Sequence, residues 1–139
     1  MLNRLNPCVV AAVLGIGSLT VSAAKAQTIT PTPSIALKNG ETFELPDAYY
    51  ISTACRSLLI ATPEVEILEG PPGVSVAIKE AMVTPRASNC AKPVTGGKVI
   101  ISAKDVDGPS FSTMTLRYKF KTRDGDRFLS QVYKIALFP

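Results

Sequence analysis

Chemistry in this sequence would rest on its charged side chains, and the first candidates are two carboxylates. Glu64 and Glu66 lie two positions apart, so a β-strand would place both on one face, where paired carboxylates can act as general acid and base. The chain contains no histidine, which excludes Ser-His-Asp and Cys-His nucleophiles and histidine-bound metals. A small secreted carboxylate-dependent hydrolase is therefore the alternative function. Alternating charges on an exposed strand face are the interpretation we favour.

A second group of charged residues is basic and lies near the C-terminus. Cations occupy alternate positions of one predicted strand, so they share a face, and the following strand adds Lys134 to that face. The members of this predicted basic strand face are Arg117, Lys119, Lys121, Arg123 and Lys134. Such a face attracts an anionic ligand or an acidic protein. The structural alternative is a solvated sheet face whose charges prevent edge-to-edge aggregation.

Two further motifs are too incomplete to carry a site. Asp105 and Asp107 precede Gly108, but calcium needs six to eight oxygen ligands and no third carboxylate follows. The segment PVTGGKV lacks the spacing of a phosphate-binding loop. We therefore expect no catalytic residue, no metal and no cofactor.

The first 26 residues have the pattern of a secretory signal peptide. Arg4 precedes an apolar stretch from Cys8 to Val21, and Ala24-Lys25-Ala26 matches a cleavage site. No second apolar run follows, so we expect no transmembrane segment in the mature chain and a periplasmic or secreted location. Loss of Arg4 and Lys25 lowers the formal charge of +4 to +2, which does not indicate a nucleic-acid partner.

The remaining cysteines, Cys55 and Cys90, fit an exported domain. An even pair in an oxidising compartment most often forms a disulfide, which would contribute on the order of 3–4 kcal/mol to stability by the chain-entropy estimate. A redox pair would usually have C-x-x-C spacing. We therefore predict one structural disulfide.

Short strand-like runs separated by turn residues make up the rest of the chain. A flexible Thr/Pro leader (27–33) precedes a single domain (34–139), in which Asn39-Gly40 indicates a hairpin. The segment 48–61 fits either a helix or a strand, and its aromatic and β-branched residues favour the strand. The predicted strands are Ser34–Lys38, Thr42–Leu45, Glu64–Leu68, the alternating run that begins at Val74, Lys98–Lys104, Thr113–Thr122 and Arg127–Phe138.

The segment VEILEGPPGVSVAIKE resembles the strand, proline/glycine turn and strand unit of bacterial immunoglobulin-like repeats. The resemblance covers about 16 residues and lacks the tryptophan and the cysteine spacing of antibody domains. Together with the many short strands, it implies an all-β fold: a single antiparallel immunoglobulin-like sandwich with one disulfide. This fold class hosts many functions and does not imply a particular one.

The last two strands allow a prediction of register. With Asp124-Gly125 as a two-residue type I′ turn, Arg123 pairs with Asp126 and Phe120 with Leu129. A slip by one residue would mix apolar and charged side chains on both faces, so this register is preferred. The expected function is a non-enzymatic exported binding or structural module of the cell envelope. Its partner would be a protein or an anionic envelope component that meets the basic strand face, and the sequence does not set the oligomeric state.

Overall fold

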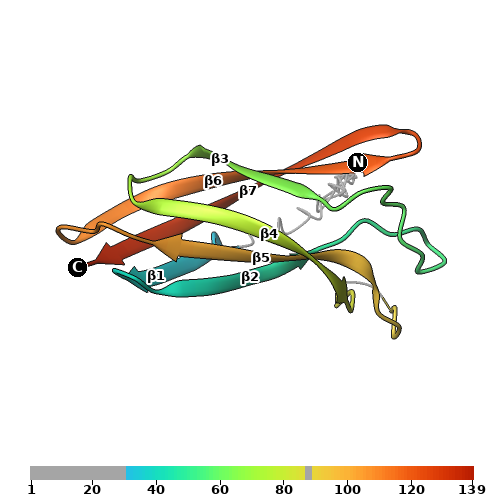
Figure 1. The fold of residues 1–139 in the computed structure, drawn as a ribbon, viewed down its shortest axis with the longest axis horizontal. Coiled ribbons are helices and arrows are strands. Elements are labelled where there is room, and N and C mark those ends of the chain that lie inside the picture. Colours follow the sequence, from blue (N-terminus) through green and yellow to red (C-terminus); the bar gives the residue numbers. More distant parts are fainter. Residues whose placement is uncertain (1–30, 87–88) are drawn as a thin grey trace, which may run out of the picture. The chain divides into compact units, whose positions relative to one another are not determined.

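The computed structural model describes residues 31–86 and 89–139. The predicted signal peptide (1–26) lies outside these residues, as does the first part of the leader. Within the described residues the chain forms seven strands and no helix, so the prediction of an all-β fold is confirmed (Figure 1). The strands are β1 (Ser34–Lys38), β2 (Thr42–Ala48), β3 (Glu64–Glu69), β4 (Val74–Val83), β5 (Val94–Ala103), β6 (Ser110–Thr122) and β7 (Gly125–Phe138).

The strands form two sheets with the orders β1-β7-β6-β3 and β2-β5-β4. The neighbours β7-β6-β3 and β2-β5-β4 match the G-F-C and B-E-D neighbours of an immunoglobulin-type sandwich. Among the described strands, every pairing is antiparallel except that of β1 with β7, which is parallel and places Ser34 beside Lys134. The prediction of an antiparallel sandwich with one disulfide is confirmed, and the β1–β7 pair adds one parallel pairing to it.

The core lies between the sheets and follows from the period-two pattern of each strand. Side chains at alternate positions point inward, and burial alternates accordingly along β1, β5, β6 and the second half of β7. The most deeply buried side chains of this core cluster include branched aliphatic residues and a methionine: Leu37, Val99, Ile101, Met114, Leu116, Ile135 and Leu137. Their removal from water provides the main driving force for closing the two sheets.

Two turns that resemble hairpins instead carry the chain from one sheet to the other. Gly40 has a φ of 81°, as a tight turn requires, but β1 pairs with β7 and β2 pairs with β5. The turn at 70–73 likewise connects β3 and β4 of different sheets. The prediction of a hairpin at Asn39-Gly40 was therefore wrong, because a tight turn does not specify which sheet receives the next strand.

The β6–β7 hairpin exists, but its register differs by two residues from the prediction. Thr122 pairs with Gly125 and Phe120 with Arg127, so the turn residues are Arg123 and Asp124. Gly125 has a φ of 107°, whereas Asp124 does not have the positive φ that a type I′ turn would need. Because the shift is an even number of residues, every side chain keeps its predicted face.

The segment between β2 and β3 is an irregular connection. It contains two isolated bridges, Ile51 to Ser57 and Leu59 to Thr122, and neither the predicted strand nor a helix. The chain doubles back between Tyr50 and Leu58, whose N–H donates to the Tyr50 carbonyl at 2.8 Å. None of the described segments forms a helix that could cross a membrane.

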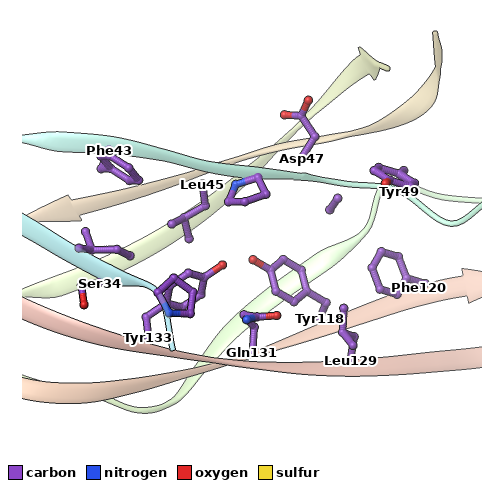
Figure 2. A pocket seen from close by; sticks show the side chains of 14 residues that line it. Ser34, Phe43, Leu45, Asp47, Tyr49, Tyr118, Phe120, Leu129, Gln131 and Tyr133 are labelled. Carbon is purple, nitrogen blue, oxygen red and sulfur yellow. The ribbon is translucent and has the colours of Figure 1, made fainter. Parts of the chain in front are cut away.

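The β1–β7 pairing stops where two prolines precede β1. The N–H of Lys134 donates to the Pro33 carbonyl at 2.9 Å, but Pro33 and Pro31 have no N–H to extend the ladder. The first half of β7 therefore has no strand neighbour on this side within the described chain. Here a pocket of about 540 Å³ opens between β2, the start of β1 and the β6–β7 pair (Figure 2). We call it the open-side pocket.

Candidate functional site: an arginine pocket at the hairpin tip

The predicted basic strand face is a face of mixed charge. Arg117 forms an ion pair with Glu66 at 2.6 Å, and Lys119 lies 3.7 Å from Glu64 and 3.6 Å from Asp126. These carboxylates belong to the strands on either side of β6, where Glu64 opposes Lys119 and Glu66 opposes Arg117. Arg117 and Lys119 therefore meet carboxylates of this same domain, which the sequence did not indicate.

The other members of the predicted face are separated. Lys121 lies opposite Asp126, and Lys134 lies opposite Thr113, four positions along β7 from the partner of Arg117. Four positions in a strand span about 13 Å. Arg123 lies in the turn itself. The five residues consequently do not form one continuous cationic surface.

Glu64 and Glu66, the alternative catalytic pair, share the outer face of β3 as predicted. Both side chains are more than half exposed, and each is paired with a cation of β6. A general acid usually needs a desolvated carboxyl group whose pKa is raised. Their surroundings are those of cross-strand ion pairs on a sheet face.

The structure instead brings three arginines together at the tip of the β6–β7 hairpin. Arg123 comes from the turn, Arg127 from the inward-facing side of β7, and Arg56 from the β2–β3 connection. They line a pocket of about 530 Å³, which we call the arginine pocket. Within the described residues, none of the three guanidinium groups has a carboxylate within 4.0 Å. Asp124 is the acidic residue of the lining.

Backbone hydrogen bonds hold the β2–β3 connection against the tip of the β6–β7 hairpin. The N–H of Ile60 donates to the Lys121 carbonyl at 3.0 Å, and Leu59 forms a bridge with Thr122. On the hairpin side, the Thr122 hydroxyl donates to the Gly125 carbonyl at 2.7 Å and accepts from the Asp124 N–H at 3.3 Å. Both walls of the arginine pocket are therefore fixed to each other by backbone contacts.

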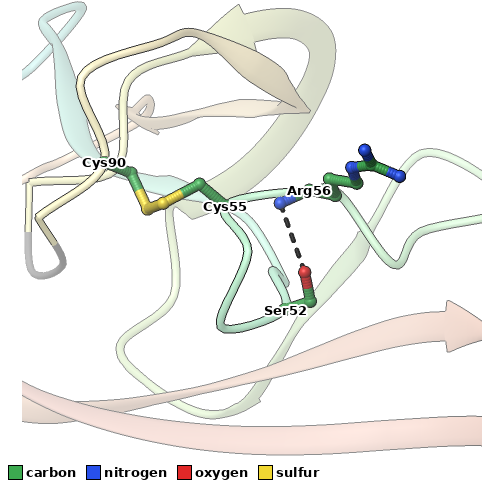
Figure 3. Close-up of a disulfide and its surroundings, with 4 residues drawn as sticks. All are labelled: Ser52, Cys55, Arg56 and Cys90. Atoms are coloured by element: carbon green, nitrogen blue, oxygen red, sulfur yellow. Dashed lines mark hydrogen bonds between the residues drawn. A yellow bond between two sulfur atoms is a disulfide. The ribbon is translucent and has the colours of Figure 1, made fainter.

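Arg56 directly follows the disulfide. Cys55 and Cys90 are bonded, as predicted, and Cys55 has a φ of 60° at the tip of the doubled-back loop. The N–H of Arg56 donates to the Ser52 hydroxyl at 3.3 Å, and the Arg56 side chain extends away from the disulfide (Figure 3). The disulfide thus fixes the loop that presents Arg56 by joining it to the connection between β4 and β5.

Three arginines line this one pocket, and arginine side chains are suited to oxyanions. Each guanidinium offers planar, forked N–H donors that match a carboxylate, phosphate or sulfate group in two-point contact. The pocket can therefore bind a group that carries several oxyanions. The described part of the chain contains no cluster of carboxylates, cysteines or histidines that could hold a metal ion.

Sequence reasoning found only Arg123 of this site. Arg56 lies 67 positions before Arg123 and was part of an ambiguous segment, and Arg127 lies on the opposite face of the hairpin from the predicted cations. A signal in the sequence was the occurrence of arginine, rather than lysine, at both ends of the segment from Arg123 to Arg127. Comparisons with protein families, curated proteins and solved structures find no match to this chain, so the functional argument rests on this geometry.

Proposed function

We propose that this domain is a non-enzymatic, exported binding module of the cell envelope that contacts an anionic partner through the arginine pocket. The observation that carries the proposal is that Arg56, Arg123 and Arg127 line one pocket and, in the described part of the chain, have no carboxylate within ion-pair distance. The export signal in the sequence supports a periplasmic or secreted location, and the disulfide is consistent with it.

The test uses an anion that has no peptide backbone. A fluorescently labelled heparin hexasaccharide is titrated with the chain that begins at Gln27, and binding is followed by anisotropy at two salt concentrations. We expect the triple variant Arg56→Ser, Arg123→Ser, Arg127→Ser to lose about tenfold or more in affinity, since charge-assisted hydrogen bonds are among the stronger polar contacts. Binding to the unchanged protein should weaken at the higher salt concentration.

The matched control removes the same number of cations elsewhere. Lys38, Lys79 and Lys104 are exposed and lie outside the arginine pocket, so their change to serine lowers the net charge equally. Equal losses of affinity in the two triple variants would mean that only net charge matters, and the proposal of a site would then be wrong. No measurable binding by the unchanged protein would also count against it.

A further inference from the structure

The open edge of β7 has backbone groups that are directed toward a missing neighbour. Lys134 donates its N–H to Pro33, and Phe138 accepts from the N–H of Asn39, so alternate residues of β7 face β1. By the same alternation, Phe128, Ser130 and Val132 direct their N–H and C=O groups to that side. In the described chain no strand pairs with them, and the prolines before β1 cannot extend the ladder. We call these three residues the open edge.

The open-side pocket lies directly beneath this edge. Its apolar walls include Phe43 and Leu45 of β2 and Leu129 of β7, and Leu129 is 53% exposed. The hydroxyl groups of Tyr118 and Tyr133 point toward each other between β2 and the β6–β7 pair (Figure 2). A side chain that entered here from a strand paired with β7 would meet apolar surface and these two hydroxyl groups.

The open edge is continuous with the arginine pocket. Arg127 lines the arginine pocket and Leu129 lines the open-side pocket, and the two residues lie two positions apart on the same face of β7. A strand added along the edge would therefore place its end beside the three arginines, where an acidic end is complementary in charge. Added strands gain affinity from main-chain hydrogen bonds and specificity from pockets for alternate side chains.

We propose that the open edge binds an extended, acidic segment of a partner protein by strand addition. The segment pairs antiparallel with Phe128, Ser130 and Val132, its alternate apolar side chains enter the open-side pocket, and its acidic C-terminal end contacts the arginine pocket. This proposal rests on the proposed function, because it identifies the anionic partner of that site as peptide carboxylates.

The test uses a synthetic peptide, acetyl-Thr-Val-Thr-Leu-Thr-Glu-Asp-Glu, with binding measured by titration calorimetry. We expect Ser130→Pro to lower its affinity about tenfold or more, since proline removes an N–H of the open edge and leaves the β6 side of the strand intact. Ser130→Ala keeps the N–H and should bind as the unchanged protein does. Similar affinities for the two variants would overturn strand addition.

A second measurement avoids any effect of proline on folding. The same peptide, N-methylated at two alternate residues, keeps its charges and side chains but loses backbone donors, and we expect it to bind the unchanged protein about tenfold or more weakly. Bound unmethylated peptide should also slow hydrogen exchange of the Phe128 and Ser130 amides. Equal affinity for both peptides, or unchanged exchange, would contradict the proposal.

The outcomes separate this proposal from the function on which it rests. Heparin binding without peptide binding would overturn strand addition and leave the anion site standing, whereas failure of both probes would remove both. If the unchanged protein forms a dimer and Ser130→Pro abolishes the dimer, the occupant of the open edge is a second copy of this chain. That result would overturn the proposal of an acidic partner segment. Retention of heparin affinity by Ser130→Pro is the expected result.

Discussion

Tyr118 and Tyr133 are the buried polar residues whose titration should affect stability. Burial is the main cause that raises the pKa of each phenol above the usual value of 10.0. Above that value, the unfolded chain loses these protons while the folded chain keeps them. The contribution of the two tyrosines to the free energy of unfolding should therefore be fully present below about pH 10 and should be lost as the pH rises further.

The predicted loss is about 1.4 kcal/mol per pH unit for each tyrosine that ionises only in the unfolded chain. The measurement is the free energy of unfolding in urea at pH 9 and pH 11, for the unchanged protein and for the double variant Tyr118→Phe, Tyr133→Phe. Lys98, whose pKa is raised by Glu44, adds a loss of the same sign in both proteins. The difference between the proteins therefore reports the tyrosines, and equal losses would contradict the prediction.

Single residues also show where sequence reasoning reached its limit. The period-two pattern of the last two strands places Met114, Leu116, Tyr133 and Ile135 on one face, and that face is buried. The pattern could not assign the ion-pair partners of Arg117 and Lys119, because those carboxylates lie on the neighbouring strands β3 and β7. The net charge of a sheet face depends on the side chains of all neighbouring strands, and the sequence does not give the order of the strands in the sheet.

At the scale of the strand, β5 shows why turn residues can be misleading. The predicted strand began at Lys98, directly after Gly96 and Gly97, but β5 begins at Val94 and both glycines lie inside it. A Cβ on Gly96 would collide with the Ala48 carbonyl oxygen of β2 and would lie 2.7 Å from a methyl carbon of Val83 in β4. Glycine is needed here because two neighbouring strands approach the backbone closely.

This close approach gives a prediction for Gly96→Ala. The added methyl group must displace β2 or β4, so we expect a loss of about 1–3 kcal/mol in the free energy of unfolding. Gly108→Ala is the matched control, since its Cβ would have no atom within 4 Å, and its effect should stay within about 0.5 kcal/mol. Thermal or urea unfolding of the two variants provides the test, and similar stabilities would show that β2 and β4 yield easily.

The predicted register of the β6–β7 hairpin was wrong for a related reason. Asp-Gly is the strongest short signal for a two-residue turn, yet the turn residues are Arg123 and Asp124, and Gly125 is the first residue of β7. Both arrangements place the same side chains in the core, so the hydrophobic pattern could not distinguish them. The observed register is the one in which the Thr122 hydroxyl donates to the Gly125 carbonyl and accepts from the Asp124 N–H.

At the scale of the molecule, the disulfide joins two long connections at one end of the sandwich. Cys55 and Cys90 are 35 positions apart, and closing a loop of that length should contribute about 4 kcal/mol by the chain-entropy estimate. Changing both cysteines to serine should remove most of this stability, as measured by urea unfolding. Because Arg56 follows Cys55, the same variant should bind the heparin probe more weakly while still folded. Unchanged stability would show that core packing alone fixes these connections.

The parallel pairing of β1 with β7 has a kinetic consequence. Ser34 and Lys134 are 100 positions apart, so this contact closes one of the longest loops in the domain. Closing that loop costs conformational entropy before the contact can stabilise the fold. Folding rates fall as the mean sequence separation of contacts rises. During synthesis, β1 leaves the ribosome well before its neighbour exists, and it must wait for β7 to emerge. Until then, the apolar face of β1 is available to chaperones and to incorrect strand partners.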